Sequence, residues 1–372
     1  MVAWLDAGNE RLDGRPKIII YAPASIEEWG PESPVTTGIG ASESQIVELA
    51  RWMSKASLNV TVYGSTPALE VESCVTWRHA NEFRHEEECD LLIAHRAPWI
   101  AHRTSLGAKK LYVWLHDQPQ SFAHAAFLPH LHSRVARYVA LTKTMALGYQ
   151  AVHGVKVSNP LIPYFLPGCD LEPLRDPLED GPICCYLSAP YRGLRELLRA
   201  WRYIVEEVPE AKLRCAYGWQ VFNSIMSVEG QELKAQRVEI EELLNLPGVA
   251  WLDRIPQQNV KALLDDSHLW LYPCTYPEQL CHVAMRAQAR GVWPVVHPYA
   301  ALAETVADGR MVDEDPTTAE GIRAFANATI KEMVRDPAEM RPRRIANRDV
   351  ALRWHDAAIG GWTQALTEDG IL

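Results

Sequence analysis

The sequence predicts an α/β protein built from two Rossmann-like domains that face a cleft. Short apolar runs alternate along the chain with amphipathic stretches of helical spacing, which is typical of parallel strands joined by crossover helices. The alternation occurs twice, before and after a proline-rich charged segment, and 372 residues are enough for two domains with a core each. We therefore expect domains over 1–170 and 171–340, followed by a helical segment over 341–372.

The first half of the chain contains the first series of strands and helices. Each predicted strand is a short apolar run, and the predicted helices carry apolar residues at helical spacing. Ser42 or Ser44 is expected to cap the first helix. The strands are expected at 17–22, 60–63, 71–77, 90–95, 111–115 and 138–141, and the helices at 42–53, 122–134 and 143–153.

The second half repeats this pattern after a linker. The sequence LEPLRDPLEDGP over 171–182 is rich in proline and charge, as linkers often are. Strands are expected at 183–188, 212–217, 249–252, 269–272 and 292–296, and helices at 194–208, 229–246, 257–266, 279–290 and near 300. Beyond Pro316 the chain is expected to be helical almost to its end.

The composition is that of a soluble globular protein, with 48% hydrophobic and 23% charged residues. No apolar run approaches the roughly 18 residues of a transmembrane helix, and the N-terminus is too polar for a signal peptide. The eight cysteines have no regular spacing and no C-x-x-C pair. We therefore expect reduced, mostly buried thiols and a cytoplasmic protein.

The charge is unevenly distributed along the chain. The whole chain carries a formal charge of −10, but residues 91–169 contain only one acid, Asp117, and eight basic residues, a net charge of +7. This asymmetry indicates either an anionic partner for the first domain or bases that pair with acids elsewhere in the chain. The basic residues are Arg96, Arg103, Lys109, Lys110, Arg134, Arg137, Lys143 and Lys156.

The stretch over 270–305 combines a buried strand, a proline-containing turn, a helix and a second buried strand. Glu278 lies in the turn, and Gly291 follows the helix, where glycine is a frequent stop signal. In open α/β sheets, ligands bind at the carboxyl ends of the strands. Glu278 is therefore a candidate ligand-binding residue.

This stretch resembles the donor-site motif of GT-B glycosyltransferases of the family 4, or group 1, type. The resemblance implies an acceptor-binding first domain, a nucleotide-sugar-binding second domain and a C-terminal helix that crosses back to the first. It also implies that Glu278 binds donor sugar hydroxyls and that the backbone of Gln279, Leu280 and Cys281 contacts sugar or phosphate. The matching residues are Pro273, Glu278, Ala287, Ala289, Gly291, Pro294, Val295 and Val296.

A second run, over 186–219, is similar to the S-x-P-x-R-G-L … W … P-x-A-x-L … Y-G-W pattern of bacterial and viral group 1 enzymes. In this run Arg192 and Gly193 follow a strand and open a helix, where a guanidinium can hold a diphosphate in a bidentate manner. The alternative is a solvated surface charge. Arg254 leaves the next strand in the same direction, and the matching position in the family is basic and faces the donor phosphates.

Two features of the first half are expected to face the cleft. His116 and Asp117 follow a buried strand, and the family carries acceptor-side His or Asp residues in this region. The alternative is a histidine that only caps the strand. The turn that contains Gly40 and Ala41 resembles the family's G-G-S-E motif and would bring backbone N–H groups to a phosphate or carboxylate.

Arg286 departs from the family pattern. The family has a second glutamate at this position, which binds the nucleotide ribose, whereas a guanidinium can only donate hydrogen bonds. Three alternatives follow: the nucleotide is held differently, with Arg286 at this position, Glu304 substitutes for the missing glutamate, or donor use has changed. The acidic run Asp313-Glu314-Asp315 is interpreted as a surface turn, and no metal site is expected.

The resemblance as a whole implies a retaining, metal-independent transferase that uses a nucleotide sugar, with UDP-glucose as the model donor. Its acceptor would be a glycan or glycolipid hydroxyl or, given the basic segment and the viral relatives, a hydroxymethylated base in DNA. The expected location is the cytoplasm of a bacterium or of a virus-infected cell. The alternatives are a protein that binds nucleotide sugar or DNA without efficient turnover and, less favoured, a GT-B epimerase.

Overall fold

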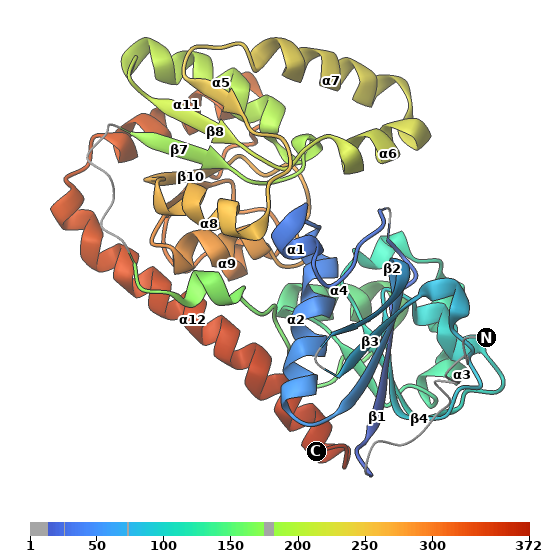
Figure 1. Cartoon of the computed structure of the whole chain (residues 1–372). Helices are drawn as coiled ribbons and strands as arrows, with labels where there is room; N and C mark the ends of the chain where they lie inside the picture. Colours follow the sequence, from blue (N-terminus) through green and yellow to red (C-terminus); the bar gives the residue numbers. More distant parts are fainter. Residues whose placement is uncertain (1–13, 26, 73, 175–181) are drawn as a thin grey trace, which may run out of the picture.

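The structure is a computed structural model that describes residues 14–25, 27–72, 74–174 and 182–372. These residues form two six-stranded sheets, in the orders β3-β2-β1-β4-β5-β6 and β12-β11-β10-β7-β8-β9. Figure 1 shows the two sheets as separate layers of the molecule, with a long helix running from one to the other. The two-domain α/β prediction is confirmed, while the proposed domain limits stay a prediction.

The first sheet has β1 at its centre. The sequence of β1 is KIIIY, and its three isoleucines are buried because parallel strands pack helices on both faces. The strands are β1 (Lys17–Tyr21), β2 (Asn59–Glu72), β3 (Val75–His79), β4 (Cys89–His95), β5 (Ala108–Trp114) and β6 (Arg137–Val139).

The second sheet is built in the same way around β7 and β10, which pair in parallel. Both are four-residue apolar strands that are buried throughout. The strands are β7 (Ile183–Tyr186), β8 (Lys212–Cys215), β9 (Val249–Trp251), β10 (Leu269–Tyr272), β11 (Trp293–Val296) and β12 (Arg310–Met311).

Helices cover both sheets. Helix α5 illustrates why they form: its buried residues Leu194, Leu197, Leu198, Trp201 and Ile204 recur at helical spacing and face the core. The helices are α1 (Ser33–Thr36), α2 (Ala41–Lys55), α3 (Pro129–His132), α4 (Lys143–His153), α5 (Leu194–Glu207), α6 (Gln220–Glu229), α7 (Gln231–Leu243), α8 (Gln257–Asp265), α9 (His282–Ala289), α10 (Leu302–Thr305), α11 (Ala319–Met333) and α12 (Pro337–Glu368).

Helix α12 begins beside the second sheet and ends against the first (Figure 1). Trp362 packs edge-on against Trp114 with ring centroids 5.2 Å apart. At the end of the helix, Asp369 accepts hydrogen bonds from Lys110 at 2.9 Å and from Arg137 at 2.7 Å. Partial burial alone would raise the pKa of Asp369, but its hydrogen bonds lower that pKa to about 2. The expected return of the C-terminal helix to the first sheet is therefore confirmed.

Several predicted elements were wrong. The predicted strand at 71–77 is divided between β2 and β3, because the backbone turns at Cys74, where φ is +70°. The predicted helix at 122–134 is replaced by short turns and α3, since Leu128 is held extended before Pro129. Neither Ser42 nor Ser44 caps α2, whose N-cap is Gly40. Helix α6 was not predicted.

Other expectations concern the surface and the thiols. All eight cysteines are free, and six of them are buried. Within the described ranges, no helix combines the length and the apolar character that crossing a membrane requires. The central part of the predicted linker, residues 175–181, lies outside the described residues.

Candidate active site

A cleft of about 330 Å³ lies between the two sheets, at the carboxyl ends of their strands. Loops and helix starts from both halves of the chain line it. Ten of the twelve predicted site residues are among the lining residues, and only Gly193 and Arg286 are not. The ten are Gly40, Ala41, His116, Asp117, Arg192, Arg254, Glu278, Gln279, Leu280 and Cys281.

On the second-sheet side of the cleft, the half-buried Arg192 forms an ion pair with the buried Glu278. Nη1 of Arg192 lies 3.2 Å from Oε1 of Glu278, and the same oxygen accepts a 2.6 Å hydrogen bond from the Tyr272 hydroxyl. The guanidinium also stacks over the Tyr276 ring, 3.9 Å from its centroid. Burial alone would lower the Arg192 pKa, but Glu278 and the nearby tyrosines hold it above its usual value. Arg192 is therefore a fixed cation.

The guanidinium of Arg192 is only partly used by the protein. Its Nε donates to the Tyr191 hydroxyl at 3.2 Å, and its Nη1 to Glu278. Its Nη2 has no hydrogen-bond partner among the described residues. The N–H groups of Nη2 can therefore bind an anion that enters the cleft.

Gly193 does not line the cleft, but it determines how closely Arg192 approaches the strand ends. Its φ is +128°, and a Cβ atom at this position would lie 2.2 Å from the carbonyl oxygen of Pro273. Only glycine fits this close approach between the start of α5 and the chain after β10. Gly193 therefore positions Arg192 without itself reaching the cleft.

Arg254 connects the two sides of the cleft. Its guanidinium pairs with the Glu27 carboxylate, which belongs to the loop after β1. Its Nε lies 3.5 Å from the Tyr217 carbonyl oxygen. The sequence did not identify Glu27 as a site residue, because loop residues without a motif carry no signal of such a long-range contact.

His116 lies on the first-sheet side and is buried. Its Nδ1 lies 2.8 Å from the Tyr164 hydroxyl, and its ring packs 4.2 Å from the His95 ring centroid. Its Nε2 has no partner within the described part of the chain. Burial, followed by the nearby His95 and Arg96, lowers the pKa of His116 well below its usual value. The imidazole is therefore neutral, and its contact with Tyr164 goes beyond capping a strand.

Asp117 is held by Arg96, a residue that the sequence did not identify. Two hydrogen bonds of 2.7 and 2.8 Å join the Arg96 guanidinium to the two carboxylate oxygens. Arg96 also donates to the Ala24 carbonyl at 3.0 Å and lies 3.5 Å from Glu43. The backbone of Arg96 is left-handed, with φ of +54°. The strand-end rule that selected Asp117 applies equally to Arg96, which directly follows β4.

Gln279, Leu280 and Cys281 line the cleft from a loop, not from a helix. The predicted helix start at 279 was wrong, because α9 begins at His282 with Cys281 as its N-cap. The Gln279 carbonyl accepts a 2.8 Å hydrogen bond from the Thr142 hydroxyl, which belongs to the first half of the chain. The loop is thereby fixed across the two halves.

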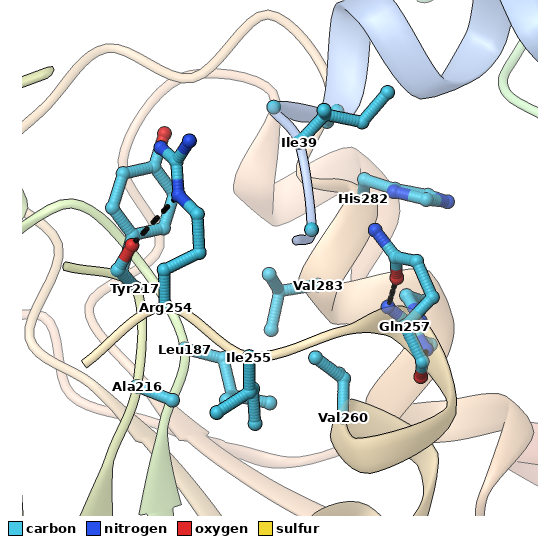
Figure 2. Close-up of a pocket in the computed structure, with 14 residues that line it drawn as sticks. Ile39, Leu187, Ala216, Tyr217, Arg254, Ile255, Gln257, Val260, His282 and Val283 are labelled. Carbon is cyan, nitrogen blue, oxygen red and sulfur yellow. Dashed lines mark hydrogen bonds between the residues drawn. The ribbon is translucent and has the colours of Figure 1, made fainter. Parts of the chain in front are cut away.

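A side pocket of about 100 Å³ adjoins the cleft (Figure 2). Its walls are mainly apolar, and Figure 2 shows Leu187, Ile255, Val260 and Val283 around it. Arg254 lines both the cleft and the pocket. The combination of a flat apolar space with a neighbouring arginine is suited to an aromatic group that carries a phosphate.

Arg286 lines this side pocket, but its hydrogen bonds are directed into the protein. It pairs with Asp170, which is fully buried, and it donates to the side chain and the carbonyl of Gln257. Glu304, one of the alternatives for the missing glutamate, lines neither the cleft nor the side pocket. Its oxygens accept hydrogen bonds from Lys143 N at 2.8 Å and Thr144 N at 3.1 Å, at the start of α4.

Most cations of the basic segment are engaged within the chain. Arg96, Lys109, Lys110 and Arg137 form ion pairs with Asp or Glu side chains. Arg134 donates to the backbone carbonyls of Ala101 and Arg103. These contacts agree with the alternative that the bases pair with acids elsewhere in the chain.

The acidic run Asp313-Glu314-Asp315 is exposed, as expected for a surface turn. Asp315 accepts hydrogen bonds from Thr317 in that turn. Across the described residues there is no group of three or more His, Cys, Asp or Glu side chains that is arranged to hold a metal ion.

Solved structures with the same architecture cover nearly the whole chain. A glycosyltransferase from Rickettsia africae superposes with a TM-score of 0.69 at 12% identity, covering 96% of this chain and 99% of that one. A sucrose-phosphate synthase from Thermosynechococcus elongatus superposes with a TM-score of 0.66 at 15% identity, covering 96% of this chain and 97% of that one. Anabaena HepE in complex with UDP and glucose superposes with a TM-score of 0.66 at 15% identity, covering 96% of this chain and 100% of that one. No curated protein is similar enough in sequence to match.

Two facing sheets, a cleft between them and a returning C-terminal helix are the architecture of the GT-B fold, which this chain shares with these solved structures. Residues 179–347 match the family model described as glycosyl transferases group 1. Over these residues the chain is similar to the group 1 glycosyl transferases, and this match together with the shared fold supports the predicted GT-B, group 1 type.

Proposed function

We propose that the protein transfers a sugar from a UDP-sugar to an acceptor hydroxyl with retention of anomeric configuration. The observation that carries this proposal is the Arg192–Glu278 pair at the strand ends, with part of the guanidinium free of partners among the described residues. An anion-binding group beside a hydroxyl-binding carboxylate suits a sugar diphosphate. The solved structure of Anabaena HepE with UDP and glucose supports the choice of donor class.

In this proposal, Arg192 and Arg254 bind the diphosphate, and Glu278 accepts hydrogen bonds from the donor sugar. The nucleotide base occupies the side pocket, because its apolar walls adjoin Arg254. Gly40 and Ala41 line both compartments and approach the donor with their backbone. Charges fixed in advance around the leaving group are expected to supply most of the rate gain, without a metal ion.

The acceptor is activated on the first-sheet side. Asp117 and the neutral imidazole of His116 orient the acceptor hydroxyl. The oxygen of this hydroxyl forms the new bond to the anomeric carbon of the donor sugar. The bond from that carbon to the phosphate oxygen breaks on the same face, and the leaving UDP takes the acceptor proton. Glu278 holds the sugar during the transfer. These roles follow from the residues' shared cleft and from the resemblance to retaining group 1 enzymes.

For the acceptor, we favour a glycan or glycolipid hydroxyl over a hydroxymethylated base in DNA. DNA binding needs unpaired cations that contact phosphates. Five of the eight cations in the basic segment are instead engaged in ion pairs or carbonyl contacts within the chain. A gel shift at low salt distinguishes the two, because binding that weakens steeply as salt rises would favour DNA.

The proposal is tested with a panel of nucleotide sugars in two assays. A donor that binds the native state raises the melting temperature by mass action. The same donor should release UDP in the presence of an acceptor, and the product should keep the anomeric configuration of the donor. Stabilisation without UDP release, with every donor and acceptor tried, would instead favour a binding protein without turnover.

A further inference from the structure

The two sides of the cleft carry opposite charges. The second-sheet side contributes Arg192, Arg254 and Glu278. The first-sheet side contributes one cation, Arg96, and the three carboxylates Glu27, Glu43 and Asp117. If these three carboxylates and Arg96 are ionised, the first-sheet side has a formal charge of −2.

Arg96 is already committed to the protein and offers little to an incoming anion. It donates two hydrogen bonds to Asp117, one to the Ala24 carbonyl and one to Glu43. Four of its five N–H groups are thereby occupied. Arg96 therefore has one N–H group left for a ligand, and the carboxylates that line the first-sheet side outnumber its one cation by two.

Glu27 and Glu43 are positioned to act on a ligand in the cleft. Both carboxylates are mostly buried, with side-chain exposures of 25% for Glu27 and 14% for Glu43. Oε2 of Glu27 bonds to Arg254, while its Oε1 has no partner within the described residues. Binding of a diphosphate by Arg254 would release Oε2 as well. Charges in such a partly buried site are screened less than those on the surface.

Two further polar groups on the same side lack partners. The indole N–H of Trp29 and Nε2 of His116 make no hydrogen bond within the described ranges, although both side chains are more than nine-tenths buried and both residues line the cleft. Buried polar groups without partners are rare in native proteins, and a ligand often satisfies them. Sugar hydroxyls can both donate and accept such hydrogen bonds.

From these observations we propose that the acceptor is a polyhydroxylated molecule with no negative charge, either neutral or bearing an amine, and that the first-sheet side rejects phosphorylated acceptors. This inference rests on the proposed function, because it assumes that the second-sheet arginines hold the donor diphosphate. With the diphosphate bound, a phosphate on the acceptor would face the carboxylates of Glu27 and Glu43, and among the described residues that line this side the cation is Arg96, which is already engaged. A hydroxyl or an ammonium group would be attracted to them.

The test measures binding of small probes to the protein saturated with UDP. Methyl β-D-glucoside, glucosamine and glucose 6-phosphate are titrated by ligand-observed NMR at low salt. The glucoside and glucosamine should each bind at least about tenfold more tightly than glucose 6-phosphate, as expected from two nearby like charges. In the double variant Glu27→Gln/Glu43→Gln, the difference in affinity between these probes and glucose 6-phosphate should fall to about threefold. Added salt should also reduce this difference in the native protein.

A matched control removes the same charge far from the cleft. The double variant Glu206→Gln/Glu210→Gln alters exposed residues at and just beyond the C-terminal end of α5. It should leave the difference in probe affinity unchanged. Tighter binding of glucose 6-phosphate, a difference that the double variant does not alter, or no binding of the uncharged and amine probes would overturn the inference. Absence of UDP binding would show in the preceding titration and would instead contradict the proposed function.

Discussion

The cleft around Arg192 and the connection between the domains around Arg286 each contain an arginine from the second domain, half-buried in the first case and buried in the second, and the two are used differently. Arg192 shares its charge with Glu278 and keeps Nη2 without a partner among the described residues. Arg286 directs its guanidinium to Asp170 and to Gln257. A guanidinium with free N–H groups can bind a ligand, whereas a saturated one holds the structure together.

Arg286 is part of a larger set of contacts at this connection. Arg290 donates to the carbonyls of Glu172 and Pro173 at 2.6 and 3.2 Å, and Arg348 of α12 donates to the carbonyl of Glu172 at 2.8 Å. Three arginines thus fix the chain after Asp170. Where the resemblance implies a glutamate, this chain has an arginine that anchors the connection between the domains.

The largest expected effect follows from restoring the family residue. Arg286→Glu would place a carboxylate beside buried Asp170, and the free energy of unfolding should fall by about 3–5 kcal/mol. Chemical denaturation followed by circular dichroism measures this change. A variant as stable as the native protein that also binds UDP more tightly would contradict the anchoring role. Adding Asp170→Asn to Arg286→Glu removes the repulsion and should recover part of the lost stability.

The opposite pattern is expected at the cleft. Arg192→Ala should lower kcat/KM about 100-fold to 1,000-fold, because a fixed charge at the leaving group is lost. Its stability should change less than that of Arg286→Glu, because Glu278 keeps its hydrogen bond from Tyr272 and no second carboxylate is placed beside it. Steady-state UDP release gives the rate. Arg199→Ala, on the outer side of α5 and paired with Glu239, is the matched control and should keep its activity.

The dependence of stability on pH reports on buried histidines at the cleft and near Arg286. Burial lowers the pKa of His95 and His116 well below 6.5 and that of His282, near Arg286, to about 3. The unfolded chain then binds more protons than the native one below pH 6.5, so stability falls as the pH falls from 6.5 towards these lower values. Each histidine contributes up to about 1.4 kcal/mol per pH unit. Denaturation at several pH values checks this, and a flat profile between pH 6 and 4.5 would contradict it.

The smallest predicted effect concerns the contact that joins the two sides of the cleft. Glu27→Gln releases Arg254 from a carboxylate with which phosphate must compete. UDP should therefore bind about fivefold more tightly, the equivalent of about 1 kcal/mol. Isothermal titration calorimetry measures the affinity. Weaker binding in this variant would show that Glu27 orients Arg254 for the donor and does not compete with it.

The sequence predicted the sheets better than their connections. Parallel strands such as β1 and β10 are apolar throughout because both faces are covered, so they stand out in composition. The turn at Cys74 lies inside the predicted strand VESCVTW, and the residue type of Cys74 does not indicate its positive φ. Pro129 interrupted a helical spacing that had been given more weight than the proline.

The candidate site shows the same division between local and long-range information. His116, Asp117, Arg192 and Glu278 follow strands, so the rule that ligands bind at strand ends brought them together correctly. Partners that come from distant segments were missed. Asp170 lies 116 residues before Arg286, and Glu27 lies 227 residues before Arg254, and no local pattern links either pair.

The central claim is that Arg192 binds the donor phosphates while Arg286 serves the structure. The most direct test is calorimetric titration of UDP into the native protein, Arg192→Ala and the matched control Arg199→Ala, with each variant shown to be folded. We expect Arg192→Ala to bind UDP at least about tenfold more weakly than the native protein, and Arg199→Ala to bind UDP as tightly as the native protein. Undiminished UDP binding by folded Arg192→Ala would contradict it.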